Sequence, residues 1–260
     1  MKRTGSRRKP EERTERGLYT TNDKFVVALS GCLSTEPGSL ESMMAGKTAG
    51  ATGSQIELAL TQDSMGVLCQ DGVLTGRDGS RIDVSEYNFE QVRTQHPMVV
   101  SLGQAMELAK SMGHLFVVRL RSPRAADILK TTLRYGDYES QSLVYGLAPE
   151  ELAQVQARHP DLRMLLGVTA PVSQPERFVD QVHQAGLFGL LVRPDHLTEE
   201  LCQAAHRVGL FVGVLHADGE EEIRQAVEWG VNFILTDRPD LAARHLPQDQ
   251  NVPAPRMYIR

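Results

Sequence analysis

Short apolar runs alternate with segments of helical periodicity along most of the chain. Residues 25–29 form such a run, and it suits a strand that is buried on both faces of a parallel sheet. Further strands are predicted at residues 55–60, 115–120, 142–145, 163–168, 187–192, 210–214 and 232–235. Helices are predicted between them, at residues 40–48, 102–112, 124–133, 149–158, 175–184, 198–208 and 220–229, with a short last helix that ends near residue 245.

The number of strands indicates the fold class. Eight successive strand–helix units in about 230 residues are typical of an α/β fold of the TIM (β/α)8 barrel type. An open doubly wound sheet normally has fewer strands. We therefore predict one barrel that covers residues 23–246.

The second predicted strand begins the most informative stretch, residues 56–71. It reads as a strand, a tight polar turn and a short return strand. Because side chains alternate along a strand, Glu57 and Ala59 share one face. The polar residues 75–96 follow, with Gly76, Gly79 and no sustained period, and they are predicted to be a loop that leaves the barrel.

Composition and charge limit the classes of function. The chain has 260 residues and 41% hydrophobic content, which is enough for one large core. A net charge of −5 argues against a surface devoted to nucleic acid, so no nucleic-acid partner is expected. Three cysteines without a CxxC spacing favour a reducing, cytoplasmic location over a disulfide framework or a structural zinc site. The oligomeric state is not indicated.

No segment looks like a membrane span or a secretory signal. Apolar runs stay below the roughly 18–20 residues that a span needs, so a soluble and unexported protein is expected. Residues 1–22 are dense in Lys and Arg and are predicted to be a disordered tail, with an anchor for anionic lipid or nucleic acid as the alternative. Residues 247–260 contain three prolines and read as a C-terminal extension.

The barrel prediction selects the residues that could carry chemistry. In a TIM barrel the functional face is at the carboxyl ends of the strands. The polar or exceptional residues at those ends are Ser30, Glu57, Ala59, Arg119, Arg121, Arg193, His216 and Asp237.

Several of these segments resemble one family. Residues 231–240, Val-Asn-Phe-Ile-Leu-Thr-Asp-Arg-Pro-Asp, resemble the closing strand of the glycerophosphodiester phosphodiesterases. Residues 56–63, with Val67 and Asp71, resemble the second strand and hairpin of that family, and residues 99–108 resemble the helix after its long insertion. The resemblance implies a TIM barrel of a phosphoric diester hydrolase family of lipid metabolism.

The resemblance also implies a set of catalytic groups. The family reaction is a metal-assisted attack on a phosphodiester, with two histidines as acid and base and three carboxylates on a divalent cation. At the positions of the two histidines this chain has Ser30 and Gln70. At the positions of the three carboxylates it has Glu57, Ala59 and Arg119.

These replacements predict a pseudoenzyme that needs no cofactor. Neither serine nor glutamine titrates near neutral pH, so neither can act as the proton shuttle. One carboxylate is too few to hold a hard divalent cation against water. Adjacent strands bring their ends within salt-bridge reach, so we expect the Arg119 guanidinium to replace the charge of the metal beside Glu57.

Two interpretations of the charged residues at the barrel mouth are open. In the first, Arg119, Arg121 and Arg193, together with Glu57 and Asp71, form a site for a phosphate-containing small molecule. In the second, Arg119 is neutralised by Glu57 and Arg121 by Asp71 or Asp237, which leaves a polar plug. A protein partner for the barrel, or a structural or oligomerising role, is a further option.

The alternative to a pseudoenzyme is an active phosphoric diester hydrolase of glycerophospholipid metabolism with a rearranged site. His216, just beyond the seventh strand, is the candidate base under this reading, with a divalent cation such as Ca²⁺ or Mg²⁺. Cys69 is a candidate nucleophile by type, but no histidine or helix N-terminus is evident beside it, which favours a packed small side chain.

Overall fold

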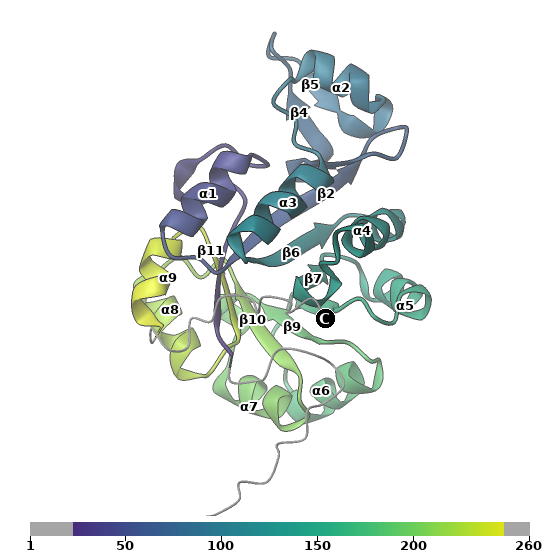
Figure 1. Ribbon diagram of the computed structural model, residues 1–260. Coiled ribbons are helices and arrows are strands. Elements are labelled where there is room, and N and C mark those ends of the chain that lie inside the picture. The colour runs from purple at the N-terminus through teal and green to yellow at the C-terminus, as the bar shows by residue number, and fades with distance from the viewer. Residues whose placement is uncertain (1–22, 247–260) are drawn as a thin grey trace, which may run out of the picture.

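Eight parallel strands form a nearly closed barrel in the computed structural model, which describes residues 23–246 (Figure 1). Their order round the barrel is β7 (Ser142–Tyr145), β6 (Leu115–Leu120), β2 (Gly53–Leu60), β1 (Phe25–Ala28), β11 (Phe233–Thr236), β10 (Phe211–Leu215), β9 (Gly189–Val192) and β8 (Leu165–Val168). The two ends of this order meet where the amide of Val144 donates to the carbonyl of Arg163, at 2.9 Å. The predicted fold class is confirmed.

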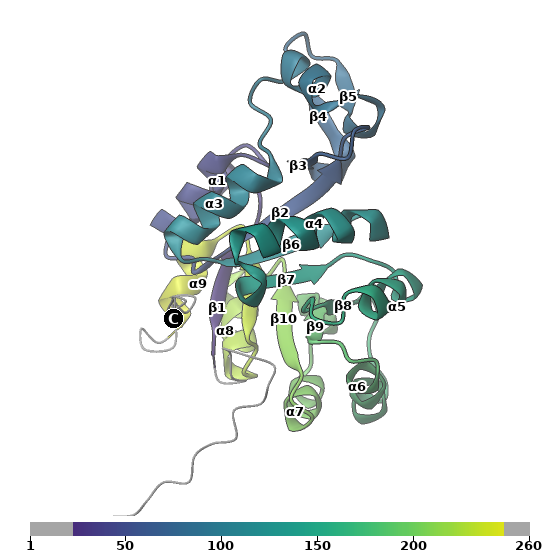
Figure 2. The same cartoon turned by 45° about the vertical axis from the view of Figure 1, so that its right-hand side comes forward.

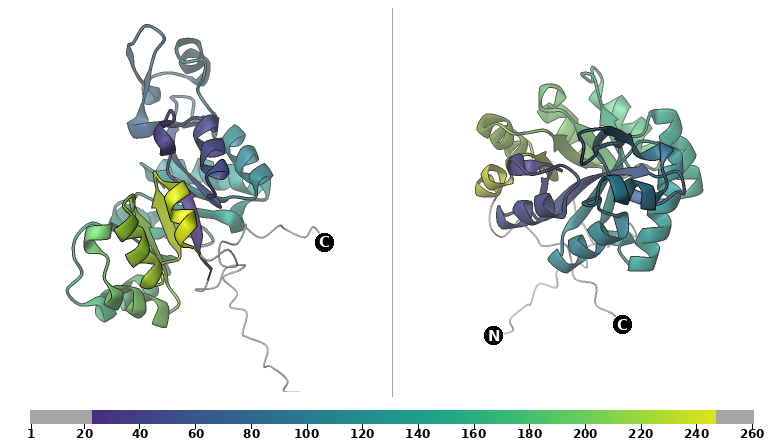
Figure 3. Two further views of the ribbon diagram at one scale, coloured as in Figure 1. Left: turned by 90° about the vertical axis from the view of Figure 1, so that its left-hand side faces the viewer. Right: turned by 90° about the horizontal axis from the view of Figure 1, so that it is seen from above.

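Helices surround the barrel, so its strands are buried on both faces (Figures 2 and 3). They are α1 (Leu40–Thr48), α3 (Leu102–Met112), α4 (Pro123–Gly136), α5 (Pro149–Arg158), α6 (Pro175–Gln184), α7 (Glu199–Arg207), α8 (Glu220–Glu228) and α9 (Pro239–His245). The bounds of α1, α3, α5, α6, β6 and β7 coincide with the predicted ones, and the remaining predicted elements of the barrel differ by a few residues at their ends.

Alternation along each strand divides the core into two layers. On β1, Phe25 and Val27 pack inside the barrel, whereas Val26 and Ala28 pack in the layer beneath the helices. Aromatic rings from the first residues of neighbouring strands fill the amino-terminal end of the interior. Phe211 and Phe233 stack there with ring centroids 5.8 Å apart. Space for a ligand is therefore confined to the carboxyl-terminal half of the barrel.

The connection between β2 and α3 contains a small group of secondary-structure elements outside the barrel, at the top of Figure 1. The strand β3 (Gly66–Leu68) pairs antiparallel with β2, and a hairpin of β4 (Val73–Thr75) and β5 (Arg81–Asp83) leads to α2 (Phe89–Gln95). The prediction that residues 75–96 form a loop is wrong. Val84 and Val92 are buried against Val67, and this small cluster gives the segment its order.

The predicted tail at residues 1–22 and the extension at residues 247–260 lie outside the described residues. Within residues 23–246, no helix combines the length and the apolar character that a bilayer crossing requires.

Thr198→Ala should lower the free energy of unfolding by about 1 kcal/mol, because the Thr198 hydroxyl accepts from the Leu201 amide at 3.2 Å and caps α7 as predicted. Urea denaturation followed by circular dichroism measures the effect. Thr131→Ala is the matched control, since this hydroxyl only donates to the Asp127 carbonyl within α4, and it should change stability by less than about 0.5 kcal/mol. Equal losses would contradict the capping role.

Candidate functional site

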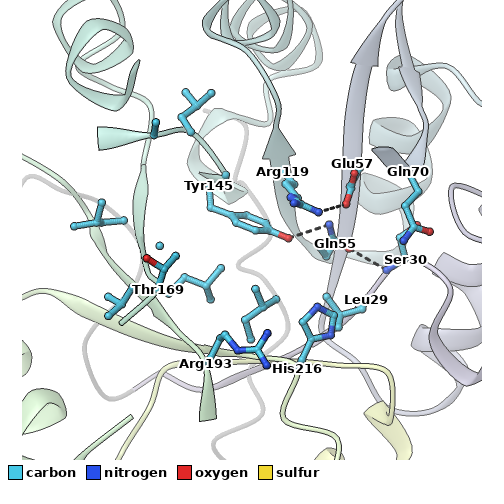
Figure 4. Close-up of a pocket in the computed structure, with 18 of the residues that line it drawn as sticks. Leu29, Ser30, Gln55, Glu57, Gln70, Arg119, Tyr145, Thr169, Arg193 and His216 are labelled. Atoms are coloured by element: carbon cyan, nitrogen blue, oxygen red, sulfur yellow. Dashed lines mark hydrogen bonds and ion pairs between the residues drawn. The ribbon is translucent and has the colours of Figure 1, made fainter. Parts of the chain in front are cut away.

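A cavity of about 700 Å³ opens at the carboxyl ends of the strands (Figure 4). Most of the polar residues selected from the sequence lie on its wall: Ser30, Glu57, Gln70, Arg119, Arg193, His216 and Asp237. Its remaining polar lining includes Gln55, Tyr145 and Thr169. Ala59, Asp71 and Arg121 are not part of this wall. The strand-end rule therefore located the cavity but not every residue that was selected with it.

Strand register decides which side chains meet on one wall. Glu57 of β2 is level with Arg119 of β6, and Arg119 is level with Tyr145 of β7. All three side chains have the orientation of Val117, which packs inside the barrel two residues before Arg119. The apolar interior of β6 therefore changes to a charged wall at Arg119.

Glu57 has partners on both carboxylate oxygens. Its Oε1 forms the expected ion pair with the Arg119 guanidinium (Figure 4). Its Oε2 accepts a hydrogen bond from the Asp71 amide at 3.1 Å, with Nη1 of Arg121 at 3.7 Å. The Glu57 side chain is only 8% exposed, so these contacts replace water rather than compete with it. Burial lowers the pKa of Arg119, but the charge of Glu57 and its hydrogen bond leave that pKa raised overall.

Arg121 is neutralised at the rim of the mouth. Its Nη1 lies 2.6 Å from Oδ1 of Asp71, which was one of the two partners expected for it. The other expected partner, Asp237, lies on a different strand end and forms no ion pair with Arg121 within the described part of the chain. At this side of the mouth, the polar-plug reading fits the contacts.

The opposite side of the mouth is formed by the ends of β9, β10 and β11. Arg193 and His216 project from it (Figure 4). Arg193 is 58% exposed at its side chain, and its Nε lies 3.4 Å from Oδ1 of Asp195. His216 has a φ of 60°, and its amide donates to the Leu235 carbonyl at 2.8 Å, which ties the turn after β10 to β11.

Two carboxylates lie close to His216. Ligand atoms of His216, Asp218 and Asp237 all lie within 4.8 Å of one another. Burial and the neighbouring charge of Asp218 raise the pKa of Asp237. Asp218 Oδ1 accepts from the Thr236 hydroxyl and from the Asp237 amide, each at 2.7 Å.

Comparison with known proteins gives a match in fold and none in sequence. No protein-family model matches the sequence, and no curated protein matches it. A glycerophosphodiester phosphodiesterase from Thermotoga maritima is 16% identical with a TM-score of 0.73, over 85% of this chain and 97% of that one. Another from Parabacteroides distasonis is 17% identical with a TM-score of 0.72, over 85% and 96%. An Oleispira antarctica phosphodiesterase in complex with the product sn-glycerol-3-phosphate is 15% identical with a TM-score of 0.73, over 86% and 96%.

This chain has the fold of the glycerophosphodiester phosphodiesterases. The resemblance noticed in residues 231–240 and 56–71 is confirmed at the level of the fold, and the low identity agrees with a divergent sequence. Identities of 15–17% show the fold alone.

Ser30 and Gln70 stand where the phosphodiesterase resemblance places the two histidines, and both lie on the cavity wall. The Ser30 hydroxyl accepts from the Gly38 amide at 2.7 Å, and the Ser30 amide donates to Gln55 Oε1 at 3.0 Å. Gln55 Nε2 in turn donates to the Tyr145 hydroxyl at 3.1 Å. Neutral hydrogen bonds therefore link β1, β2 and β7 beneath the cavity.

Ala59 and Cys69 belong to the apolar layer between the phosphodiesterase-fold barrel and its insertion. Ala59 is 7% exposed and Cys69 1% exposed, and both pack against Val67 or Val84. Burial, with the nearby charge of Glu57, raises the pKa of the Cys69 thiol to about 12. Cys69 is a packed thiol and not an activated nucleophile.

Sequence reasoning missed Gln55, Tyr145 and Asp218. Alternation gave a signal for two of them, because Gln55 precedes Glu57 by two residues and Tyr145 ends its strand. Asp218 lies beyond the end of β10, in the turn that precedes α8. Its approach to Asp237 depends on the contact between two strand ends and has no local signature.

Proposed function

We propose that this chain is a noncatalytic protein with the glycerophosphodiester phosphodiesterase fold, and that it binds a phosphorylated small molecule in the barrel mouth. The observation that carries the proposal is the ion pair of Glu57 with Arg119, at the wall where the resemblance places a divalent cation. The guanidinium supplies there a permanent positive charge that needs no metal.

The residues at this wall do not fit the cation of the family. Glu57 uses one oxygen for Arg119 and the other for the Asp71 amide. Ala59 offers no oxygen and is buried in an apolar cluster. A hard divalent cation takes about six or more oxygen ligands, several of them from carboxylates, and Arg119 would repel it.

The acid and base of the family mechanism also have no equivalent at their positions. Ser30 and Gln70 carry no group that exchanges a proton near neutral pH. The phenol of Tyr145 also lies on this wall, but burial raises its pKa. It is therefore unsuited to act as a general acid or base near neutral pH. These features support loss of the ordinary mechanism.

Ligand binding is supported by the rest of the cavity. Its volume of about 700 Å³ is ample for a glycerol phosphate. Arg193 and His216 can donate to phosphate oxygens, and Gln55, Tyr145 and Thr169 can pair with hydroxyl groups. Arg193 is suited to the phosphate because Asp195 contacts it only through Nε.

The hydrolysis test uses bis-p-nitrophenyl phosphate and glycerophosphocholine, each with Ca²⁺, Mg²⁺ or Mn²⁺. We expect no turnover above the uncatalysed rate. The second candidate function, a diester hydrolase with a rearranged site, is favoured by the position of His216 on the cavity wall beside Asp237. Turnover that disappears in His216→Ala would establish that candidate and overturn the pseudoenzyme proposal.

The binding test titrates sn-glycerol-3-phosphate into the full chain by calorimetry in buffer that contains EDTA. Arg193→Ala should weaken binding by about tenfold, because a half-exposed charge-assisted hydrogen bond contributes about 1–2 kcal/mol. Arg207→Ala is the matched control, since that side chain is 57% exposed and pairs with Glu176 outside the cavity. Absence of binding, or equal effects of the two variants, would refute the phosphate site. The cytoplasmic location and the absence of a nucleic-acid partner stay predictions.

A further inference from the structure

His216, Asp218 and Asp237 form a cluster of potential metal ligands on the side of the mouth away from Glu57. His216 and Asp218 follow β10, and Asp237 follows β11. Going round the barrel from β2, the order is β1, β11 and β10, so this cluster is separated from the Glu57–Arg119 pair by β1. His216 and Asp237 line the large cavity, which leaves room on that side for water or for a ligand.

The geometry of the cluster is close to that of a three-ligand site. One imidazole nitrogen and two carboxylate oxygens lie within 4.8 Å of one another. A cation bound at about 2.0–2.2 Å needs such atoms roughly 3 Å apart, which small side-chain rotations can provide. The remaining coordination positions would face the cavity, in the open arrangement of catalytic or ligand-binding metal sites.

The ligands are held in place by contacts that leave coordinating atoms available. Oδ1 of Asp218 accepts hydrogen bonds from the Thr236 hydroxyl and the Asp237 amide. Its other oxygen, Oδ2, remains available to coordinate a cation. The Leu235 carbonyl accepts the amide of His216 and fixes the backbone that carries the imidazole. Contacts of this kind orient metal ligands in known sites.

The charge balance of the two sides differs. Glu57 is matched by Arg119, whereas no ion pair joins Asp218 or Asp237 to a lysine or arginine anywhere in residues 23–246. Two carboxylates that lie this close repel each other, and a divalent cation between them would remove the repulsion. A cation is thus favoured beside the two carboxylates that no lysine or arginine of residues 23–246 pairs with.

We propose that His216, Asp218 and Asp237 bind one divalent transition-metal ion, with Zn²⁺ and Mn²⁺ as the ions that fit. One imidazole with two carboxylates suits these ions, whereas Ca²⁺ and Mg²⁺ prefer oxygen ligands throughout. The site goes beyond the proposed function and does not depend on it. A cation here would add positive charge near Arg193 and strengthen the binding of a phosphate, but holding it requires no phosphate.

Equilibrium dialysis of the tag-free full chain against ZnCl₂ or MnCl₂, after EDTA treatment and in buffer without phosphate, tests the site. We expect one ion per chain. His216→Ala and Asp218→Asn should each weaken binding by at least about tenfold, since even loss of an orienting contact has an effect of that size. His245→Ala is the matched control, because His245 also faces a carboxylate, Glu220 at 3.6 Å, but lies outside the cluster.

A second measurement tests the site without any substitution, and so does not depend on whether the variants fold. Crystals of the unmodified chain soaked in MnCl₂ should give an anomalous peak among the three side chains. A peak elsewhere, an absence of stoichiometric binding, or equal binding by His216→Ala and His245→Ala would overturn the site. Because glycerol phosphate is titrated in EDTA and the metal without phosphate, failure of one proposal is distinct from failure of the other.

Discussion

Arg119→Ala is expected to lower the free energy of unfolding by about 2 kcal/mol. The substitution leaves the buried carboxylate of Glu57 with the Asp71 amide and a distant Arg121 as its remaining partners. Breaking a fully buried ion pair costs about 3–5 kcal/mol, and an exposed one less than about 1 kcal/mol. Arg119 is 41% exposed at its side chain and Glu57 8%, so an intermediate value applies. Guanidinium denaturation at pH 7 measures it.

Arg121→Ala is the matched control for this measurement. Its side chain is also 41% exposed, but its close partner Asp71 is 68% exposed, so the loss should stay below about 1 kcal/mol. Glu57→Leu combined with Arg119→Leu should recover most of the stability, because replacing both partners leaves no uncompensated charge. Equal losses in Arg119→Ala and Arg121→Ala would show that Arg119 does not compensate a buried charge.

The barrel was predictable because its signals are local. Each strand is a short apolar run, and several helices begin at residues with a known role, such as Pro149 at a first turn and Thr198 as a cap. The order of the insertion was not predictable, because it depends on contacts between residues that are not sequence neighbours. Its order comes from Val67, Val84 and Val92, which are far apart in the sequence and show no common period.

The candidate site was predictable where neighbouring strands determine it. Glu57 and Arg119 could be paired from the sequence because the second and third barrel strands lie side by side in register. Asp218 could not be found in this way. Its place depends on the left-handed turn at His216 and on hydrogen bonds to Thr236 and Asp237, which exist only once β10 and β11 are aligned.

Acidification from pH 7 to pH 4 should remove about 3 kcal/mol of stability through His114 alone. The His114 side chain is fully buried before β6, with Nδ1 2.8 Å from the Ser54 hydroxyl. Burial, with a smaller contribution from the charge of Lys47, lowers its pKa from 6.5 to about 4. Between these values the unfolded chain binds a proton that the folded chain does not. As the pH decreases through this range, the free energy of unfolding therefore decreases by about 1.4 kcal/mol per pH unit.

The His114 contribution is isolated by comparing two proteins across the same pH range. His114→Asn keeps a polar partner for Ser54 and carries no titrating group, so its stability should fall by about 3 kcal/mol less than that of the unmodified chain between pH 7 and pH 4. Carboxylates such as Asp237 titrate in both proteins, and their effect cancels in the difference. Urea denaturation at several pH values gives the two curves. Parallel curves would mean that His114 accepts its proton in the folded barrel as readily as in the unfolded chain.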